Sequence, residues 1–225
     1  MTDQTIKVAV NGALGRMGQT VLGAVEADPA TIAVGGADSA ASASTVTVPG
    51  GNPVPLAATL ADLLSKVDAD VVVDFSNGAG AVDTMAAATS GGVRVVSGST
   101  GVPPGELERF GSIAAEKGVG IISASNFALG AVLMMYLAEV AGPHFQFADL
   151  IESHHEAKID SPSGTALSIA DAARVGRDND FTYNEPEKVT LDEVRGGLMG
   201  GVNVHSARMA GRMARHELVF GTSGQ

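Results

Sequence analysis

The sequence is poor in sulfur chemistry, in aromatic side chains and in positive charge. Its 225 residues include no Cys and no Trp, aromatic residues make up 4%, and 14 Lys and Arg against 25 Asp and Glu give a formal net charge of −11. The absence of Cys excludes disulfides, thiolate zinc sites, iron–sulfur clusters and cysteine nucleophiles, and it fits a reducing compartment. The acidic balance argues against binding to nucleic acid, because no broad basic surface can neutralise phosphates.

Long apolar runs are also missing from the sequence. The first ten residues lack the basic and apolar segments of a signal peptide, and no stretch is long enough for a transmembrane helix. We therefore expect a cytoplasmic protein with no membrane partner. The hydrophobic content of 45% is rich in Ala and Val, which is typical of helices packed on a parallel sheet and predicts the α/β class.

The order of sequence patterns predicts two domains. In the first half, short β-branched runs alternate with helical patterns, which indicates βαβ units and a parallel sheet. Strands are expected at 6–10, 32–37, 71–75, 93–97 and 120–124, helices at 15–27, 60–67, 81–88 and 107–117, and a loop with at most a short edge strand at 39–55. Later helices at 129–140 and 163–174, with strands at 149–154, 202–207 and 217–220, predict a second, α+β domain. The expected domains are 1–126 and 127–225.

A glycine-rich turn follows the first expected strand. The glycines at 12, 15 and 18 lead into an amphipathic helix, so backbone N–H groups at its start can meet a pyrophosphate. Asp38 follows the second strand about 20 residues later, where an acid commonly holds an adenosine ribose. This combination predicts a dinucleotide site; the alternative is a tight junction with a surface aspartate. The predicted contacts are Gly12, Ala13, Leu14, Gly15, Arg16, Met17 and Asp38.

The residues after Asp38 bear on the choice of cofactor. Ser39 and Ala40 supply no cation for a 2′-phosphate, which favours NADH, while Arg16 keeps NADPH open. Two further turns, 98–101 and 125–127, follow expected strands, and ligands of open α/β sheets bind along that edge. Both turns are therefore candidates for the rest of the cofactor crevice, with ordinary loop chemistry as the alternative.

Reactive side chains gather in residues 152–166. Two of the five histidines, His154 and His155, lie within five residues of Lys158 and bring acidic protons into a negatively charged protein. Adjacent residues on a strand point to opposite faces, so both histidines can serve one site only if the strand ends there. The alternative is one solvated and one packed histidine. A metal site built with Glu156 ranks low, because adjacent ligands suit a compact metal shell poorly.

The same run predicts a helix start that binds a carboxylate. Ser161 is expected to cap the helix and Pro162 to lie in its first turn, which leaves the N–H groups of Ser163, Gly164 and Thr165 free. Gly164 lets a ligand approach the backbone, and the hydroxyls on either side of it can donate further hydrogen bonds. An ordinary helix start is the alternative.

The run 152–166 resembles the signature of the 4-hydroxy-tetrahydrodipicolinate reductases, also called dihydrodipicolinate reductases, of the diaminopimelate route to lysine. The pattern Glu-x-His-His-x-x-Lys-x-Asp-x-Pro-Ser-Gly-Thr-Ala is complete there. Ala157 departs from members that carry another basic residue, which weakens the local positive field. The resemblance extends through Gly-x-x-Gly-Arg-Met-Gly at 12–18, Asp-Phe-Ser at 74–76, Gly-Ser-Thr-Gly at 98–101, Ser-Asn-Phe at 125–127 and His-Ser-x-Arg at 205–208.

This resemblance implies a Rossmann-type parallel-sheet domain that binds NADH or NADPH, and an α+β domain that binds the substrate and assembles homotetramers. His154 and Lys158 are implied to handle protons. Carboxylate binding is implied for His155, Gly164 and Thr165, with a further charged contact from Arg208. The implied contacts of the nicotinamide half are Gly98, Ser99, Thr100, Ala124, Ser125, Asn126 and Phe127.

The implied reaction is the transfer of hydride from NADH to a conjugated C=C–C=N system in a small cyclic dicarboxylate, while a positioned acid supplies a proton. Both His154 and Lys158 suit that role at neutral pH, and the sequence does not choose between them. The rivals are another two-domain dehydrogenase of an aspartate-derived substrate and a dinucleotide-binding sensor without turnover. The resemblance also implies a closing strand and helix beyond Gln225, a segment that this chain is expected to lack.

Overall fold

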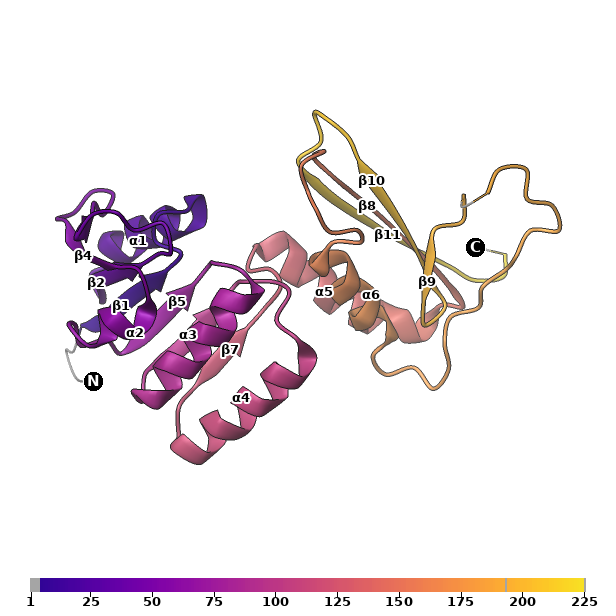
Figure 1. The fold of residues 1–225 in the computed structure, drawn as a ribbon. Coiled ribbons are helices and arrows are strands. Elements are labelled where there is room, and N and C mark those ends of the chain that lie inside the picture. The colour runs from indigo at the N-terminus through magenta and orange to yellow at the C-terminus, as the bar shows by residue number, and fades with distance from the viewer. Residues whose placement is uncertain (1–4, 193, 225) are drawn as a thin grey trace. The chain divides into compact units, whose positions relative to one another are not determined.

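The computed structural model describes residues 5–192 and 194–224, and its chain divides into two compact units, Met1–Ser125 and Asn126–Gln225 (Figure 1). The division falls one residue before the expected boundary. Each unit has its own sheet and its own buried core. Within the described ranges, no helix has both the length and the apolar character needed to cross a membrane.

The N-terminal unit is built on a seven-stranded sheet in the order β3-β4-β2-β1-β5-β6-β7. Its neighbouring strands are parallel except for the antiparallel pair β3 and β4. All five expected strands are present, and the segment expected to form a loop contributes the two short edge strands. The bounds are β1 (Ile6–Asn11), β2 (Thr31–Ala37), β3 (Thr45–Val46), β4 (Val54–Ala57), β5 (Val71–Asp74), β6 (Arg94–Ser97) and β7 (Ile121–Ser123).

Helices cover both faces of this sheet because the central strands are apolar on both sides. On β1, Val8 and Val10 pack in a core with Leu22 of α1 (Arg16–Ala27), while Ala9 belongs to a second core with Leu63 of α2 (Leu60–Leu64) and Met85 of α3 (Gly78–Ser90). The last helix of this unit is α4 (Pro104–Lys117). This two-sided burial is typical of parallel sheets.

Two of these helices begin three residues before the expected positions, for reasons of capping. The side chain of Asn77 accepts a hydrogen bond from the Gly80 N–H and thereby starts α3. Pro104 occupies the first helical position of α4, where its missing N–H is not needed. The hydrophobic pattern alone did not include these polar and proline starts.

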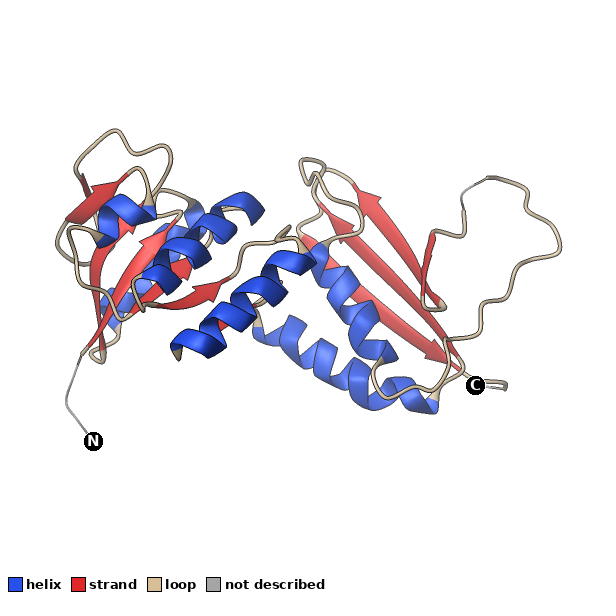
Figure 2. Ribbon diagram, turned by 60° about the horizontal axis from the view of Figure 1, so that its bottom comes forward, coloured by secondary structure: helices blue, strands red, loops and turns tan. Residues whose placement is uncertain are grey.

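The C-terminal unit has a four-stranded sheet in the order β11-β8-β10-β9, in which β8 and β10 are parallel and the outer pairs are antiparallel. Its helices lie on one side of the sheet, around a core that includes Leu150, Ile169 and Val204 (Figures 1 and 2). The three-residue β9 was not predicted. The bounds are α5 (Leu129–Ala141), β8 (Phe147–His154), α6 (Gly164–Arg174), β9 (Gly197–Met199), β10 (Val202–Arg208) and β11 (Ala214–Gly221), with a short 3-10 helix at Gly142–His144.

Candidate active site

A cavity of about 850 Å³ opens at the carboxyl ends of β1, β2 and β5. Its lining includes Gly12 and Gly15 of the glycine turn, Asp38 after β2, and the turn at 75–77 after β5. Ligands of open parallel sheets bind at this edge. The cavity is therefore lined by three of the residues that the sequence predicts to contact a dinucleotide, namely Gly12, Gly15 and Asp38.

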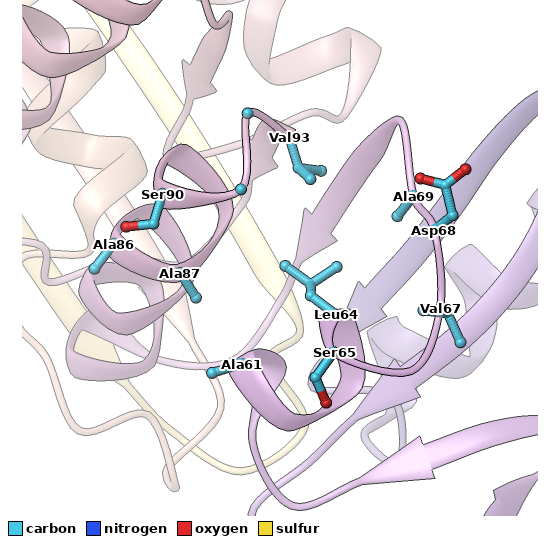
Figure 3. Close-up of a pocket in the computed structure, with 12 residues that line it drawn as sticks. Ala61, Leu64, Ser65, Val67, Asp68, Ala69, Ala86, Ala87, Ser90 and Val93 are labelled. Carbon is cyan, nitrogen blue, oxygen red and sulfur yellow. The ribbon is translucent and has the colours of Figure 1, made fainter.

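A second hollow, of about 860 Å³, lies between α2 and α3 (Figure 3). Residues 67–69 and 91–93, which line it, precede β5 and β6, so it lies toward the amino ends of these strands. Its lining is mainly small and aliphatic, and its carboxylate, Asp68, is 2.6 Å from the ammonium of Lys7. This lining holds no Lys, Arg or His side chain that would attract phosphate, whereas the glycine turn lines the first cavity.

The glycine turn is held by contacts that only glycine permits. Gly12 has φ = +78°, and a Cβ atom there would lie 2.6 Å from the carbonyl oxygen of Phe75. A Cβ atom on Gly18 would collide with the carbonyl oxygen of Gly12. Gly15 is the N-cap of α1 and has no side chain with which to accept from the first-turn N–H groups. Those donors are therefore available to a phosphate.

Alanine at Gly12 should weaken dinucleotide binding by at least about tenfold and cost about 1–3 kcal/mol of stability, because a side chain at positive φ is strained and meets Phe75. Fluorescence titration with NADH and thermal unfolding measure the two effects. The matched control is Gly111→Ala in α4, where an added Cβ atom meets open space; it should be neutral or stabilise by up to about 1 kcal/mol. Wild-type affinity in Gly12→Ala would contradict the assignment of this turn.

Asp74, at the carboxyl end of β5, ties together the loops at the edge of the cavity. Its fully buried carboxylate accepts hydrogen bonds from Asn11 Nδ2 (2.9 Å), Ser97 Oγ (2.7 Å) and Ser99 Oγ (2.7 Å), and also from Ser76 Oγ (2.6 Å). The hydroxyl of Ser99, a predicted cofactor contact, is thus directed at the protein. Sequence reasoning gave Asp74 no role, although an acid at the end of a Val-rich strand was an available signal.

The predicted contacts in the nicotinamide loops differ in their surroundings. Gly98 packs against the Phe75 ring, which a Cβ atom would strike, and Thr100 is exposed. In the C-terminal unit, Asn126 Nδ2 donates to Thr165 Oγ1 at 3.2 Å, which brings a predicted cofactor contact to a predicted substrate contact. Phe127 is 46% exposed.

Glu152, near the end of β8, is the centre of the C-terminal site. Its carboxylate is fully buried and accepts from both terminal nitrogens of Arg208 (3.0 and 2.8 Å) and from the Ser163 N–H (3.2 Å). His154 Nδ1 lies 2.6 Å from Glu152 Oε2. Because this contact places the ring proton on Nδ1 in the neutral histidine, Nε2 is the nitrogen left to exchange a proton with a ligand.

The strand register explains how these residues meet. His154 is the last residue of β8, and His155, after the strand, is exposed. The strand thus ends at the histidine pair, as it must if both histidines are to serve one site. Glu152 and His154 are two residues apart on one strand and share a face. Arg208 of β10 pairs with His154 in the sheet, and His216 of β11 pairs with Glu152.

Glu152 and His216, which face each other across two strands, have displaced pKa values. Burial raises the pKa of Glu152, but hydrogen bonds from Arg208, Ser206, His154 and the Ser163 N–H outweigh it and hold the pKa at about 2. Burial lowers the pKa of His216, and the field of His154 adds to this effect. Glu152 is therefore a permanent anion at physiological pH, and His216 is biased toward its neutral form.

His216 was not among the predicted site residues. Its ring lies 5.3 Å from that of His154 in an edge-to-face contact, and its Nε2 is 3.2 Å from Ser163 Oγ. The residue lies 53 positions after Ser163 in the sequence, and the pairing of β11 with β8 brings it there. Its one sequence signal was that histidine is rare in this chain.

The predicted N-cap of the substrate-binding helix was wrong by two residues. Ser163, not Ser161, is the N-cap of α6, and its hydroxyl accepts from the Ala166 N–H at 3.2 Å. Pro162 therefore lies before the helix. The N–H of Ser163 was expected to be free, but it donates to Glu152. Ser163 is the cap because its hydroxyl accepts from a first-turn N–H group, while its own N–H donates to the buried carboxylate of Glu152.

Lys158 and Asp160 occupy the loop between β8 and α6. Lys158 Nζ lies 2.6 Å from Asp160 Oδ1, and the Gly164 N–H also donates to the Asp160 carboxylate. Burial raises the pKa of Asp160, while the hydrogen bond from Lys158 and the other contacts lower it to a net depressed value. The N–H of Gly164, which was also expected to be free, thus already binds an anion.

Arg208 differs from its predicted role as a free charge beside the ligand. Both of its terminal nitrogens bind Glu152, and Nη2 also donates to the carbonyl oxygen of Asp160 at 2.6 Å. A guanidinium committed to a buried carboxylate carries little unneutralised charge.

Within the described residues, no group of three or more His, Cys, Asp or Glu side chains could hold a metal ion.

Comparisons with known proteins identify relatives over nearly the whole chain. Residues 6–127 match the family model for dihydrodipicolinate reductase, N-terminus, and residues 130–225 match its C-terminus. The 4-hydroxy-tetrahydrodipicolinate reductase of Dehalococcoides mccartyi (strain ATCC BAA-2266) is 39% identical over 98% of this chain and 83% of the relative. That of Bacillus cytotoxicus is 36% identical over 98% of this chain and 84% of the relative.

A solved structure agrees with these sequence matches. Dipicolinate-bound dihydrodipicolinate reductase from Paenisporosarcina sp. TG-14 matches with a TM-score of 0.79 and 31% identity, covering 99% of this chain and 85% of that one. A Rossmann-type sheet with its glycine turn, followed by a smaller mixed sheet with clustered acid–base groups, defines a two-domain NAD(P)H-dependent oxidoreductase. Within that class, the chain belongs to the dihydrodipicolinate reductase family.

Proposed function

We propose that this protein is a 4-hydroxy-tetrahydrodipicolinate reductase of the lysine and diaminopimelate route, acting on a small cyclic dicarboxylate. The observation that carries the proposal is the start of α6, where the Lys158 ammonium and the Gly164 N–H contact the carboxylate of Asp160, close in sequence to His154, and so form a place for a carboxylate. Family membership supports it, as does the relative with dipicolinate, a cyclic dicarboxylate, in its structure.

The dinucleotide supplies the hydride when it is bound, and the chain's residues bind, orient and protonate. In the N-terminal unit, the glycine turn and Asp38 would hold the dinucleotide, while Asp74 keeps the neighbouring loops in place. In the C-terminal unit, the substrate carboxylates would contact His155, Ser163, Gly164 and Thr165. We assign Arg208 a positioning role through Glu152, because its guanidinium is already paired there.

Two groups are candidates for the proton donor. Glu152 holds Nδ1 of His154, so the opposite nitrogen of the ring can pass a proton to the substrate. The Lys158 ammonium lies beside the same carboxylate site. Glu152 orients the His154 ring for the first of these roles.

NADH is the proposed preferred cofactor, with NADPH as the alternative. The Asp38 carboxylate accepts from the Leu14 N–H and the Ala40 N–H, both at 2.9 Å, and is therefore fixed at the edge of the cavity. A fixed negative charge at that edge favours the ribose hydroxyls of NADH and repels a 2′-phosphate. Arg16, exposed at the start of α1, is a cation that would favour NADPH.

Location and assembly stay predictions. A cytoplasmic location is expected from the absence of Cys. A homotetramer is expected from the family resemblance, and light scattering on the purified protein measures it.

The test of this function is the oxidation of NADH and NADPH in the presence of the freshly made condensation product of pyruvate and aspartate semialdehyde. Wild type should turn over, faster with NADH, and His154→Ala should be at least about a hundredfold slower with an unchanged NADH affinity. Turnover of aspartate semialdehyde itself would favour the rival dehydrogenase. Tight NADH binding without turnover of any substrate would favour the sensor.

A further inference from the structure

The carboxylate site at the start of α6 is filled by the protein's own side chain. Asp160 Oδ1 lies 2.6 Å from Lys158 Nζ, and the Asp160 carboxylate also accepts from the Gly164 N–H. The Asp160 side chain is 42% exposed and that of Lys158 is 24% exposed. This ion pair therefore lies at the surface, where a ligand from solution can reach it.

Gly164 is one of the groups that the proposed function assigns to a substrate carboxylate, and the Lys158 ammonium lies beside it. A substrate carboxylate and the Asp160 carboxylate cannot both take the Gly164 N–H. We propose that Asp160 is a displaceable internal carboxylate, which occupies the substrate's carboxylate site in the free protein and leaves it when a dicarboxylate binds. This inference rests on the proposed function.

The surroundings allow the Asp160 side chain to leave while its backbone stays. Arg208 Nη2 donates to the Asp160 carbonyl oxygen at 2.6 Å, and the same guanidinium is held by the buried carboxylate of Glu152. This contact fixes the backbone of Asp160 from the protein side. Rotation about the Cα–Cβ bond is then enough to move the carboxylate into solvent, and exposed ion pairs of this kind are weak.

The exchange makes Asp160 a determinant of specificity. A ligand carboxylate that replaces Asp160 restores both contacts, one from Lys158 and one from Gly164. A neutral ligand cannot restore the ion pair, so displacing Asp160 leaves the ammonium without a counter-charge. Asp160 thus imposes a requirement for an anionic group on any ligand that enters this site, and lowers the apparent affinity of every ligand that does.

The experiment is calorimetric titration of the whole protein with dipicolinate, comparing wild type, Asp160→Ala and the nearly isosteric Asp160→Asn. If Asp160 fills the site about nine-tenths of the time, removing it should tighten the dipicolinate Kd by about tenfold, because the fraction of competent protein rises. The matched control is Asp171→Ala. Asp171 lies on α6, the helix that follows Asp160, and pairs with Arg174 at 3.3 Å. Its loss should leave the Kd unchanged.

The direction of the change decides between the two roles open to Asp160. Tighter binding in folded Asp160→Asn supports displacement, and Asp160→Ala should then also bind more tightly than wild type. Weaker or unchanged binding in folded Asp160→Asn would overturn it, and would mean that Asp160 only orients Lys158. Wild-type protein that fails to bind dipicolinate would count against the proposed function, a different result from wild type that binds and an Asp160→Asn that binds less.

Discussion

Alanine in place of Lys158 is expected to lower kcat by about two to four powers of ten while leaving NADH affinity nearly unchanged. Lys158 Nζ lies 2.6 Å from Asp160 Oδ1, beside the start of α6 in the C-terminal unit. The glycine turn belongs to the N-terminal unit. The substitution removes a proton donor or a carboxylate ligand without altering the dinucleotide turn. Steady-state kinetics and a separate NADH titration measure the two quantities.

Lys158→Arg separates proton transfer from charge. A guanidinium keeps the positive charge but does not release a proton near neutral pH. If Lys158 donates the proton, kcat stays low while dicarboxylate affinity recovers; if His154 donates it, both recover. Lys188→Ala, at an exposed position of the same unit, is the control and should match wild type. A kcat in Lys158→Ala within about threefold of wild type would remove Lys158 from the mechanism.

Glutamine in place of Glu152 is expected to cost about 3–5 kcal/mol of the free energy of unfolding. The carboxylate is fully buried and is the partner of Arg208, of His154 and of the Ser163 N–H. A neutral amide leaves the Arg208 guanidinium without a counter-charge. The amide NH2 group of the glutamine is itself a donor, and it faces groups that donated to the carboxylate. Urea unfolding of the two proteins measures the loss, and kcat should also fall because the His154 tautomer is no longer fixed.

The effect of Glu152 should depend on pH in a defined window. The pKa of this group is about 2 in the folded protein against an ordinary value of 4.5, so the unfolded state takes up its proton first as the pH falls. Its contribution is therefore complete above pH 4.5 and is lost as the pH falls toward 2. The stability gap between wild type and Glu152→Gln should narrow over that range.

The control for Glu152 is Glu217→Gln, in β11 of the same sheet. Glu217 pairs with Arg215 at 2.8 Å, but its side chain is 47% exposed, so its loss should cost less than about 1 kcal/mol. Equal stability losses in the two variants would contradict the special role of the buried carboxylate. A loss in Glu152→Gln that stays constant down to pH 2 would contradict the displaced pKa.

Much of the fold could be predicted because its signals are local. The strands of the N-terminal unit are β-branched runs, and the glycine turn is visible as spacing at Gly12 and Gly18. One error lies where two residues of the same type could do the same work. At the start of α6, both Ser161 and Ser163 carry a suitable hydroxyl, and the choice depended on the buried Glu152, which binds the Ser163 N–H.

The candidate site was only partly predictable, because three strands build it. His154, Lys158 and the start of α6 lie in one run of sequence. Arg208 joins them through the parallel pairing of β10 with β8, and His216 through the antiparallel pairing of β11 with β8. A signature gives residue types but no register, so the guanidinium was expected to face a ligand when its partner is Glu152.

Glu152 and Arg208 lie 56 positions apart in the sequence, so during synthesis the carboxylate is made well before its guanidinium partner. At about 5–20 residues per second, a ribosome needs ~3–11 s to add that segment. During this interval β8 has neither the partner of its carboxylate nor its parallel neighbour β10, so burial of Glu152 would leave an uncompensated charge. The N-terminal unit, whose strands all precede residue 125, can fold meanwhile. The dinucleotide-binding half is thus expected to mature on the ribosome before the half that handles protons.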